Sequence, residues 1–142
     1  MKRSRKVFVS GPIHGMEKNQ RYRDRLKQIL IKHGFTVLDP WNREKVVYSS
    51  TGQTWWQHVP PEGFIKRDLE DIEKSDFLVA YLPFLSAGTC MELFYAKQRG
   101  KKTVVICGLE EPSPWIVAHA DYLFKSIEKF KRFLTDHRTP LL

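Results

Sequence analysis

The sequence is poor in cysteine and has no long hydrophobic run. Cys90 and Cys107 are the only cysteines among its 142 residues, and neither stands near a histidine at a spacing typical of metal ligands. Two cysteines cannot form a disulfide framework, so we expect buried thiols in a reducing compartment. The longest apolar runs, such as residues 77–85, are about half as long as a membrane-spanning helix requires. The sequence therefore predicts no membrane span.

The start of the chain does not resemble a secretory leader. The basic segment MKRSRK precedes VFVSGPIHG, which turns at a Gly-Pro pair instead of continuing into an apolar stretch and a small-residue cleavage site. We therefore expect a cytoplasmic protein. The chain also lacks internal repeats and low-complexity segments, and its length fits one domain that spans residues 1–142.

Acidic residues are in the minority. The chain has 24 Lys and Arg against 16 Asp and Glu, which gives a net charge of +8 and a pI near 9.6. A basic protein attracts phosphates and polyanions. However, the basic residues are spread over several predicted helices, and no zinc-finger, helix-turn-helix or aromatic RNA-binding pattern accompanies them. We interpret the charge as a solvated surface, and weak nucleic-acid binding remains an alternative.

Common nucleotide-binding motifs are absent. GPIHG is not the dinucleotide fingerprint, no GxxxxGKS occurs, and the loop after the first predicted strand lacks the hydroxyl-rich phosphate loop of flavodoxins. A receiver domain would need acidic residues where Ser10 and Gly11 stand. These absences exclude the best-known nucleotide-binding and phosphoacceptor sites.

Hydrophobic periodicity and turn residues divide the chain into alternating strands and helices. The predicted strands are 6–10, 35–38, 76–82, 103–107 and a short edge strand at 121–124. The predicted helices are 19–33, 63–74, 88–99 and 126–135, with one helical turn at 115–119. Residues 41–62 hold three of the four tryptophans and show little periodicity, which is typical of a long functional loop.

Strands that alternate with helices indicate a parallel sheet covered on both faces. We expect an α/β, flavodoxin-like or Rossmann-like three-layer sandwich with a five-stranded parallel sheet of order 2-1-3-4-5. Ligands of such folds bind beyond the carboxyl ends of the strands. Four segments should meet at that edge: SGPIHG, the tryptophan-rich loop, LPFLSAGT and GLEEPSPW.

Several side chains at this edge allow two interpretations. Glu92 stands in SAGTCMELFYA, otherwise small and apolar, about one turn into its predicted helix. Pointing toward the strand ends it is a nucleophile or acid in a partly dry pocket, and pointing outward it only complements the helix dipole. Asp68 is either a second functional carboxylate or part of a solvated helix face. His14 contacts a phosphate or is an ordinary loop residue, and Ser86 and Ser113 are anion ligands or helix caps.

Three ordered motifs, VFVSGPIHG, RDLEDIEKSDFLVAYL and SAGTCMELFYA, resemble the nucleoside 2-deoxyribosyltransferase superfamily, which includes the nucleoside 5′-monophosphate N-glycosidases. In that family a strand and glycine turn precede an Asp-x-x-x-hydrophobic-x-x-Ser/Ala-Asp helix and strand, and a small-residue turn leads into Glu-Leu-Gly-x-Ala. The resemblance covers residues 6–107, and SPWI at 113–116 extends it. It places the family's glutamate at Glu92 and its helix aspartate at Asp68.

The resemblance implies an enzyme that cleaves the bond between a sugar C1′ and a base nitrogen. Glu92 would attack or stabilise C1′ from the face opposite the base, and water or a second base would resolve the glycosyl-enzyme, as in retaining glycosidases. Asp68 would deliver a proton to the departing base or orient the sugar hydroxyls. No metal and no other cofactor is required.

The resemblance also implies which groups bind the substrate. Ser86 and Ser113 match serines that hold the 5′-phosphate in the monophosphate hydrolases, and Ser113 would reach the site of a neighbouring subunit. The remaining substrate-binding positions are Phe8, Ser10, Gly11, Ile13, His14, Gly15, Trp41 and Gly88. Trp41, together with Trp55 and Trp56, forms either a flat wall for a base or a contact within the domain or between subunits.

Three positions depart from the family pattern. Phe8 stands where the family has a tyrosine beside the glutamate, and His14 stands where it has a phosphate-contacting arginine. Because a phenol near the sugar is lost, we expect ribose as well as deoxyribose to be accepted. Phe94 replaces the glycine that follows Glu-Leu, which would narrow the pocket or alter the helix packing.

These observations predict an N-glycosidase that hydrolyses (deoxy)ribonucleoside 5′-monophosphates to free base and sugar 5-phosphate. One alternative is a nucleoside 2-deoxyribosyltransferase that exchanges bases between deoxynucleosides. An alternative of another class is a non-catalytic nucleotide sensor that keeps the pocket without turnover. We expect a homodimer or larger homo-oligomer, because family members assemble so, with a small nucleotide or nucleoside as substrate and neither nucleic acid nor membrane as partner.

Overall fold

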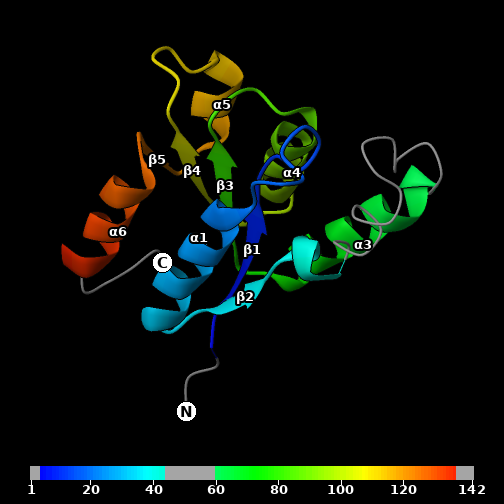
Figure 1. Cartoon of the computed structure of the whole chain (residues 1–142), viewed down its shortest axis with the longest axis horizontal. Helices are drawn as coiled ribbons and strands as arrows, with labels where there is room; N and C mark the ends of the chain where they lie inside the picture. The colour runs from blue at the N-terminus through cyan, green and yellow to red at the C-terminus, as the bar shows by residue number, and fades with distance from the viewer. Residues whose placement is uncertain (1–3, 44–59, 137–142) are drawn as a thin grey trace.

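The computed structural model describes residues 4–43 and 60–136, which form an α/β fold around one parallel sheet (Figure 1). The sheet has five strands in the order β2-β1-β3-β4-β5, and each neighbouring pair is parallel. The strands are β1 (Lys6–Ser10), β2 (Thr36–Leu38), β3 (Phe77–Leu82), β4 (Lys102–Cys107) and β5 (Tyr122–Phe124). The predicted fold class and strand order are confirmed.

Helices cover both faces of the sheet, in three layers (Figure 1). On one face lie α1 (Arg21–Lys32) and α6 (Ile127–Asp136), and their apolar side chains share one core with the strands. On the other face lie α3 (Pro61–Lys74), α4 (Ala87–Gln98) and α5 (Pro114–His119), which contribute to a second core.

Alternation along the strands distributes side chains between the two cores. On β1, Val7 and Val9 pack in the core beneath α1 and α6, whereas Phe8 packs in the core beneath α4. The central strand β3 reads FLVAYL, and all of its residues except Tyr81 are buried. A strand that is covered on both faces can be apolar throughout, which explains this composition.

Turn and cap residues set the boundaries of the helices. Gly34 follows α1 with a φ of +90°, a left-handed conformation that glycine adopts without steric cost. α3 begins at Pro61, slightly before the predicted start, because proline suits the first turn of a helix. Residues 40–43 form a helical turn at the start of the predicted loop, and Trp55 and Trp56 lie outside the described residues.

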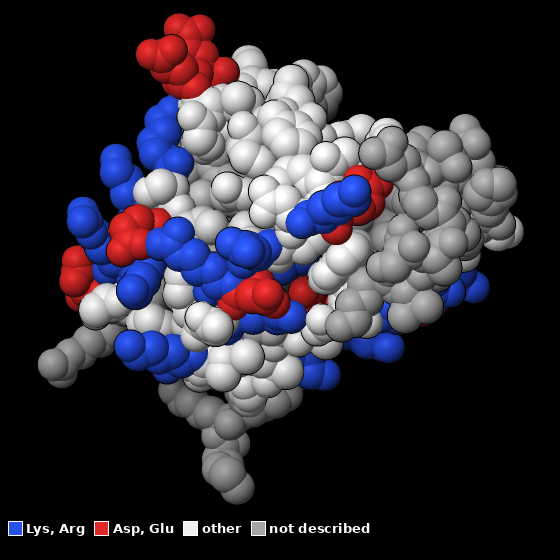
Figure 2. All heavy atoms as spheres, viewed as in Figure 1, with Lys and Arg blue, Asp and Glu red and all other residues white. Residues whose placement is uncertain are grey.

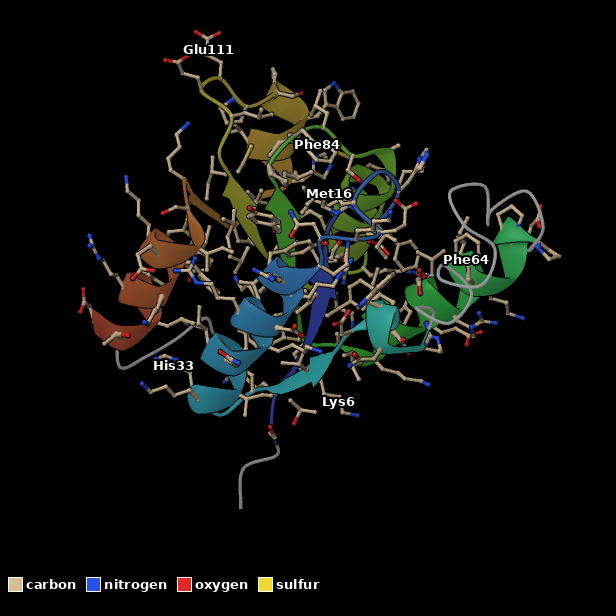
Figure 3. The ribbon with its side chains drawn as sticks, in the orientation of Figure 1. Lys6, Met16, His33, Phe64, Phe84 and Glu111 are labelled. Atoms are coloured by element: carbon tan, nitrogen blue, oxygen red, sulfur yellow. The ribbon has the colours of Figure 1, made fainter. Side chains whose placement is uncertain are left out.

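The loops after β1 and β3 lie at the same end of the sheet. Met16 in the first loop and Phe84 in the second lie beyond the carboxyl ends of the strands, and Lys6 marks the opposite end (Figure 3). This edge is where open α/β sheets bind their ligands. The fold therefore brings the predicted site segments after β1 and β3 together.

Charges of both signs are interleaved on the surface over α1 and α6, while the visible surface near α5 carries fewer charges (Figure 2). Arg25 of α1, for example, pairs with Glu128 of α6. Within residues 4–43 and 60–136, none of the helices has the length and apolar character needed to cross a bilayer.

Candidate active site

A cavity of about 420 Å³ opens beside the carboxyl end of β1, between the loop that follows this strand and helices α3 and α4. Both predicted carboxylates line it, Asp68 from α3 and Glu92 from α4. The other predicted site residues among its lining are Gly11, Ile13, His14, Ser86 and Gly88. Segments that are far apart in the sequence therefore share one cavity.

Glu92 faces this cavity from α4, and its carboxylate is tied to the end of β1. The Ser10 hydroxyl, which is buried, donates a 2.6 Å hydrogen bond to Oε1 of Glu92. Neighbouring positions Leu93 and Ala96 are buried in the core and fix the rotation of the helix. The Glu92 side chain points inward and is therefore available to a ligand in the cavity. It is more than a charge that complements the helix dipole.

The N-terminus of α4 forms another part of the cavity wall. Ser86 caps the helix, and its side-chain oxygen accepts hydrogen bonds from the Thr89 amide at 3.5 Å and the Thr89 hydroxyl at 3.0 Å. Gly88 lies in the first turn and lines the cavity. Backbone amides at a helix N-terminus favour an anionic ligand, and the N-terminus of this helix opens on the cavity.

Asp68 is held by a guanidinium group. Arg43 donates to Oδ1 of Asp68 at 2.9 Å and to Oδ2 of Asp71, one turn further along α3, at 2.8 Å. The two aspartate side chains are 15% and 18% exposed, so neither stands on an open helix face. Of the two, only Asp68 lines the cavity.

The loop after β1 is fixed from behind by α1. The carbonyl of Pro12 accepts hydrogen bonds from Nε2 of Gln20 at 3.1 Å and from the Tyr22 hydroxyl at 3.0 Å. Burial raises the pKa of the Tyr22 phenol well above its usual value, with Asp39 and Glu92 adding to the effect and Arg23 opposing it. The phenol therefore remains a hydrogen-bond donor at neutral pH.

Five predicted substrate-binding residues are not part of the cavity lining, and one of them, Ser10, is connected to it by its hydrogen bond to Glu92. Phe8 is fully buried in the core, and Gly15 has a φ of +86° with its amide donating to Oε1 of Glu17 at 2.9 Å. Trp41 is half-buried on the helical turn 40–43, and its amide donates to Oδ1 of Asp39 at 3.0 Å. Ser113, the last of the five, lines a different cavity.

A second cavity, of about 400 Å³, lies between α4 and α5. Ser113 lines it and caps α5 by accepting a hydrogen bond from the Trp115 amide at 3.2 Å. Its wall is mainly apolar, and Met91 and Phe94 line this cavity as well as the first. Phe94, the residue in place of the family glycine, therefore stands between the two cavities.

The sequence interpretation did not identify the apolar wall of the first cavity. Phe64, Ile65 and Leu69 of α3 line it, together with Met91 and Tyr95 of α4. The spacing of Phe64, Ile65 and Leu69 is that of one side of an amphipathic helix, and the N-terminal half of this helix extends beyond the sheet (Figure 1). Phe64 lies on this part of α3 (Figure 3).

No group of three or more His, Cys, Asp or Glu side chains is placed to hold a metal ion within the part of the chain that the structure describes. The chemistry available to the cavity from its described residues is that of two carboxylates, a histidine, hydroxyls and helix amides. Such a set suits nucleophilic or acid–base chemistry on a ligand that carries an anionic group.

Comparison with known proteins matches residues 7–133 to the family model described as nucleoside 2-deoxyribosyltransferase. A curated relative from Thermofilum pendens, the putative 2′-deoxynucleoside 5′-phosphate N-hydrolase 1, is 28% identical over 101 residues. That match covers 71% of this chain and 66% of the relative, just under two thirds of its length.

Solved structures share the fold at low sequence identity. The 2-deoxyribosyltransferase from Bacillus psychrosaccharolyticus has a TM-score of 0.68 at 20% identity, covering 96% of this chain and 99% of its own. The Clostridium botulinum CMP N-glycosidase has a TM-score of 0.65 at 19% identity, covering 94% and 100%. The names of these relatives describe enzymes that cleave or transfer N-glycosidic bonds of nucleosides or nucleotides. The family match spans most of the chain, and the protein belongs to the nucleoside 2-deoxyribosyltransferase family.

Proposed function

We propose that this enzyme hydrolyses the N-glycosidic bond of (deoxy)ribonucleoside 5′-monophosphates and releases free base and sugar 5-phosphate. The observation that carries the proposal is the pair of carboxylates in one cavity, with Glu92 oriented by a 2.6 Å hydrogen bond from Ser10. The name of the Thermofilum pendens relative describes hydrolysis of a 5′-phosphorylated substrate and supports the same choice.

Glu92 acts as the nucleophile. A bond forms between a Glu92 carboxylate oxygen and C1′ while the bond from C1′ to the base breaks and leaves its electron pair on the base nitrogen. Water then attacks C1′, which releases the carboxylate and the sugar phosphate. The hydrogen bond from Ser10 supports this role because it restricts the carboxylate to one orientation before the substrate binds.

Asp68 assists the departing base. The Arg43 guanidinium favours the charged form of Asp68, so this carboxylate acts as a proton relay. It accepts the proton of the attacking water and passes it to the nitrogen of the departing base, which returns Asp68 to its carboxylate form. Its place in the cavity wall opposite α4 supports this role, and its ion pair with Arg43 restricts its side chain. This role requires a different position from that of Glu92, and the two residues do come from different helices.

The phosphate binds at the N-terminus of α4, where Ser86 and Gly88 line the cavity, with His14 across from them in the loop after β1. Hydroxyls and backbone amides at a helix N-terminus hold phosphate well. We place the sugar between this group and Glu92. We expect ribose as well as deoxyribose to be accepted, because Phe8 stands where the family has a tyrosine beside the glutamate and supplies no phenol hydroxyl.

The test is incubation of the purified chain with CMP, dCMP, GMP and dGMP, followed by HPLC for free base. We expect free base from at least one monophosphate. The corresponding nucleosides, incubated in parallel, should release none. Base release from deoxynucleotides alone would refute the ribose part, and no release from any nucleotide would refute the hydrolase.

The transferase is the second candidate, since the family model and one structural neighbour carry that name. Incubating the protein with a deoxynucleoside and a second free base separates the two activities. A transferase would form the deoxynucleoside of the second base, and a hydrolase would not. A non-catalytic nucleotide sensor is the third candidate. The observation that favours it is the exposed Phe94 in the cavity wall, where the family has a glycine. Such a sensor would show a raised melting temperature with nucleotides and no base release.

We also propose that the enzyme is a homo-oligomer in the cytoplasm. Leu85, Met91 and Trp115 form an exposed apolar surface around the second cavity, where Ser113 is placed, and a second copy of the chain would cover it. Ser113 would then approach the active site of that copy. Cys90 and Cys107 are free thiols, which fits a reducing compartment.

A further inference from the structure

A charged side chain, Arg23, is buried behind the loop that leaves β1. It lies in the first turn of α1 and is only 1% exposed. Nη1 donates to the carbonyl of Val9 at 3.1 Å and to Oδ1 of Asp39 at 2.8 Å. Nη2 donates to the carbonyl of Gly11 at 2.9 Å, and Nε donates to Oε1 of Gln20 at 2.6 Å.

The two carbonyls that Arg23 binds belong to the residues on either side of Ser10. Because Val9 and Gly11 are both held, the backbone orientation of Ser10 is fixed from both sides. The Ser10 hydroxyl in turn donates to Oε1 of Glu92 at 2.6 Å. A continuous series of hydrogen bonds and one short backbone segment therefore joins Asp39 to the carboxylate in the cavity.

Stability alone gives a weak reason for this ion pair. Two charges buried in a protein interior lose their hydration, and apolar residues of similar volume are often as stabilising. The planar guanidinium offers several donors in fixed directions, which a lysine or an apolar residue cannot reproduce. The donors of Arg23 are used on a main-chain turn beside the candidate nucleophile, so the geometry favours a role in the site.

We propose that Arg23, held by Asp39, is a positioning residue for Glu92, acting through Ser10. This inference rests on the proposed function for its kinetic consequence. Arg23 itself does not line the cavity, although it binds the carbonyl of Gly11, which does. It therefore influences the reaction through the geometry of the segment from Val9 to Gly11, which carries the Ser10 hydroxyl. Loss of that geometry misplaces the Glu92 carboxylate relative to C1′.

The first test is Arg23→Lys, which keeps the charge beside Asp39 but cannot bind both carbonyls in the same way. We expect kcat to fall about 100-fold, the effect of a misplacement of about 1 Å, while KM changes little. The matched control is Arg25→Lys on the same helix, where the side chain is exposed and pairs with Glu128. An Arg23→Lys enzyme with the kcat of this control would overturn the inference.

A double-mutant comparison separates positioning from general destabilisation. If Arg23 acts through Ser10, combining Arg23→Lys with Ser10→Ala lowers kcat no further than the worse single variant, because neighbouring residues of one network are not additive. If the kcat of the double variant falls by the product of the two single-variant losses, Arg23 acts by another route than Ser10. Such a result would overturn the proposal.

A neutral double variant, Arg23→Met with Asp39→Leu, removes both buried charges and serves where Arg23→Lys folds poorly. Its kcat per folded molecule, with folding checked by circular dichroism, should also fall about 100-fold. A crystal structure adds a readout that does not depend on turnover. A broken contact between Ser10 and Glu92 supports the inference, and an intact one overturns it. Wild-type protein without base release refutes the proposed function instead, and leaves this structural readout to decide the inference.

Discussion

Gly11 lies directly against the aromatic ring of Tyr22. A Cβ atom built on Gly11 would stand 2.7 Å from Cε2 of that ring and would also clash with the hydroxyl oxygen. The ring cannot easily retreat, since it stacks on Tyr81 with centroids 4.6 Å apart and its hydroxyl binds the Pro12 carbonyl. Glycine at position 11 is therefore required by packing behind the loop that lines the cavity.

Gly11→Ala should destabilise the protein by about 1–3 kcal/mol, the usual cost of overpacking a well-packed site. The control is Gly63→Ala on α3, where an added Cβ meets no atom within 4 Å. That change should be neutral or stabilise by about 0.4–1 kcal/mol. Urea unfolding of both variants measures the difference, and equal effects of the two substitutions would contradict the packing account.

Asp68→Asn should lower kcat for base release by about 10²–10⁴-fold, the range typical of a lost general acid–base group. Asp71→Asn is a close control, because both aspartates pair with Arg43 and are similarly exposed, yet Asp71 lies outside the cavity lining. We expect it to keep nearly wild-type activity. If both variants lose activity equally, the ion pair with Arg43 matters and the proposed role of Asp68 does not.

Trp115→Glu should convert the proposed homo-oligomer into monomer, because it places a charge within the exposed apolar surface, at a position of α5 where the tryptophan is 74% exposed. Light scattering after size exclusion would then give the 16.7 kDa mass of one chain instead of a multiple. Ile31→Glu is the control, since Ile31 is similarly exposed but lies on α1, across the sheet. An unchanged assembly in Trp115→Glu would argue against this interface.

Asp121 should make stability depend on pH in the acidic range. Burial raises the pKa of this carboxyl, but hydrogen bonds from Lys97 Nζ and the Thr103 amide and the Lys97 charge outweigh it and bring the pKa below its usual value. A lowered folded-state pKa stabilises the protein above the unfolded value of about 3.9. This stabilisation is lost as the pH falls from there through the folded-state pKa.

Urea unfolding between about pH 6 and about pH 2 tests this expectation, because this range includes the unfolded-state pKa of aspartate. The free energy of unfolding of Asp121→Asn should fall less steeply with acid than that of the wild type, and Lys97→Met should also flatten the curve. Parallel curves for wild type and Asp121→Asn would show that Asp121 is not linked to folding.

The fold was predictable because local pattern and long-range packing agree. The apolar run of β3 requires cover on both faces, and α1 and α4 end near glycines that stop a helix. Parallel strands joined by helices leave few topologies. Glu92 was predictable as a candidate for a related reason, since a carboxylate among apolar neighbours near a helix start needs a partner or a ligand.

The buried network around Arg23 was not predicted. The residue belongs to the basic segment RYRDRLK, whose charges were interpreted as solvated, although Arg23 precedes Leu26 and Leu30 at helical spacing. A charge on the apolar side of a helix indicates a buried partner. Besides the nearby Gln20, its partners are two carbonyls and Asp39, 16 residues away, and only the folded chain brings these together.

Asp68 illustrates a second limit. Asp68 and Asp71 lie one turn apart among charged neighbours, and periodicity alone cannot decide which of them faces a cavity. The rotation of α3 decides it, and that rotation depends on the packing of Ile72 in the core. The family resemblance selected Asp68, and the cavity lining includes it.

Glu92→Gln tests the central claim most directly, because glutamine keeps the size of the side chain and an oxygen that accepts the Ser10 hydrogen bond but is not a nucleophilic carboxylate. Wild type and variant, shown to have equal melting temperatures, are incubated with the best nucleoside 5′-monophosphate and free base is measured by HPLC. We predict free base from the wild type and none above the buffer blank from Glu92→Gln. Release by the variant at the wild-type rate would contradict the role of Glu92.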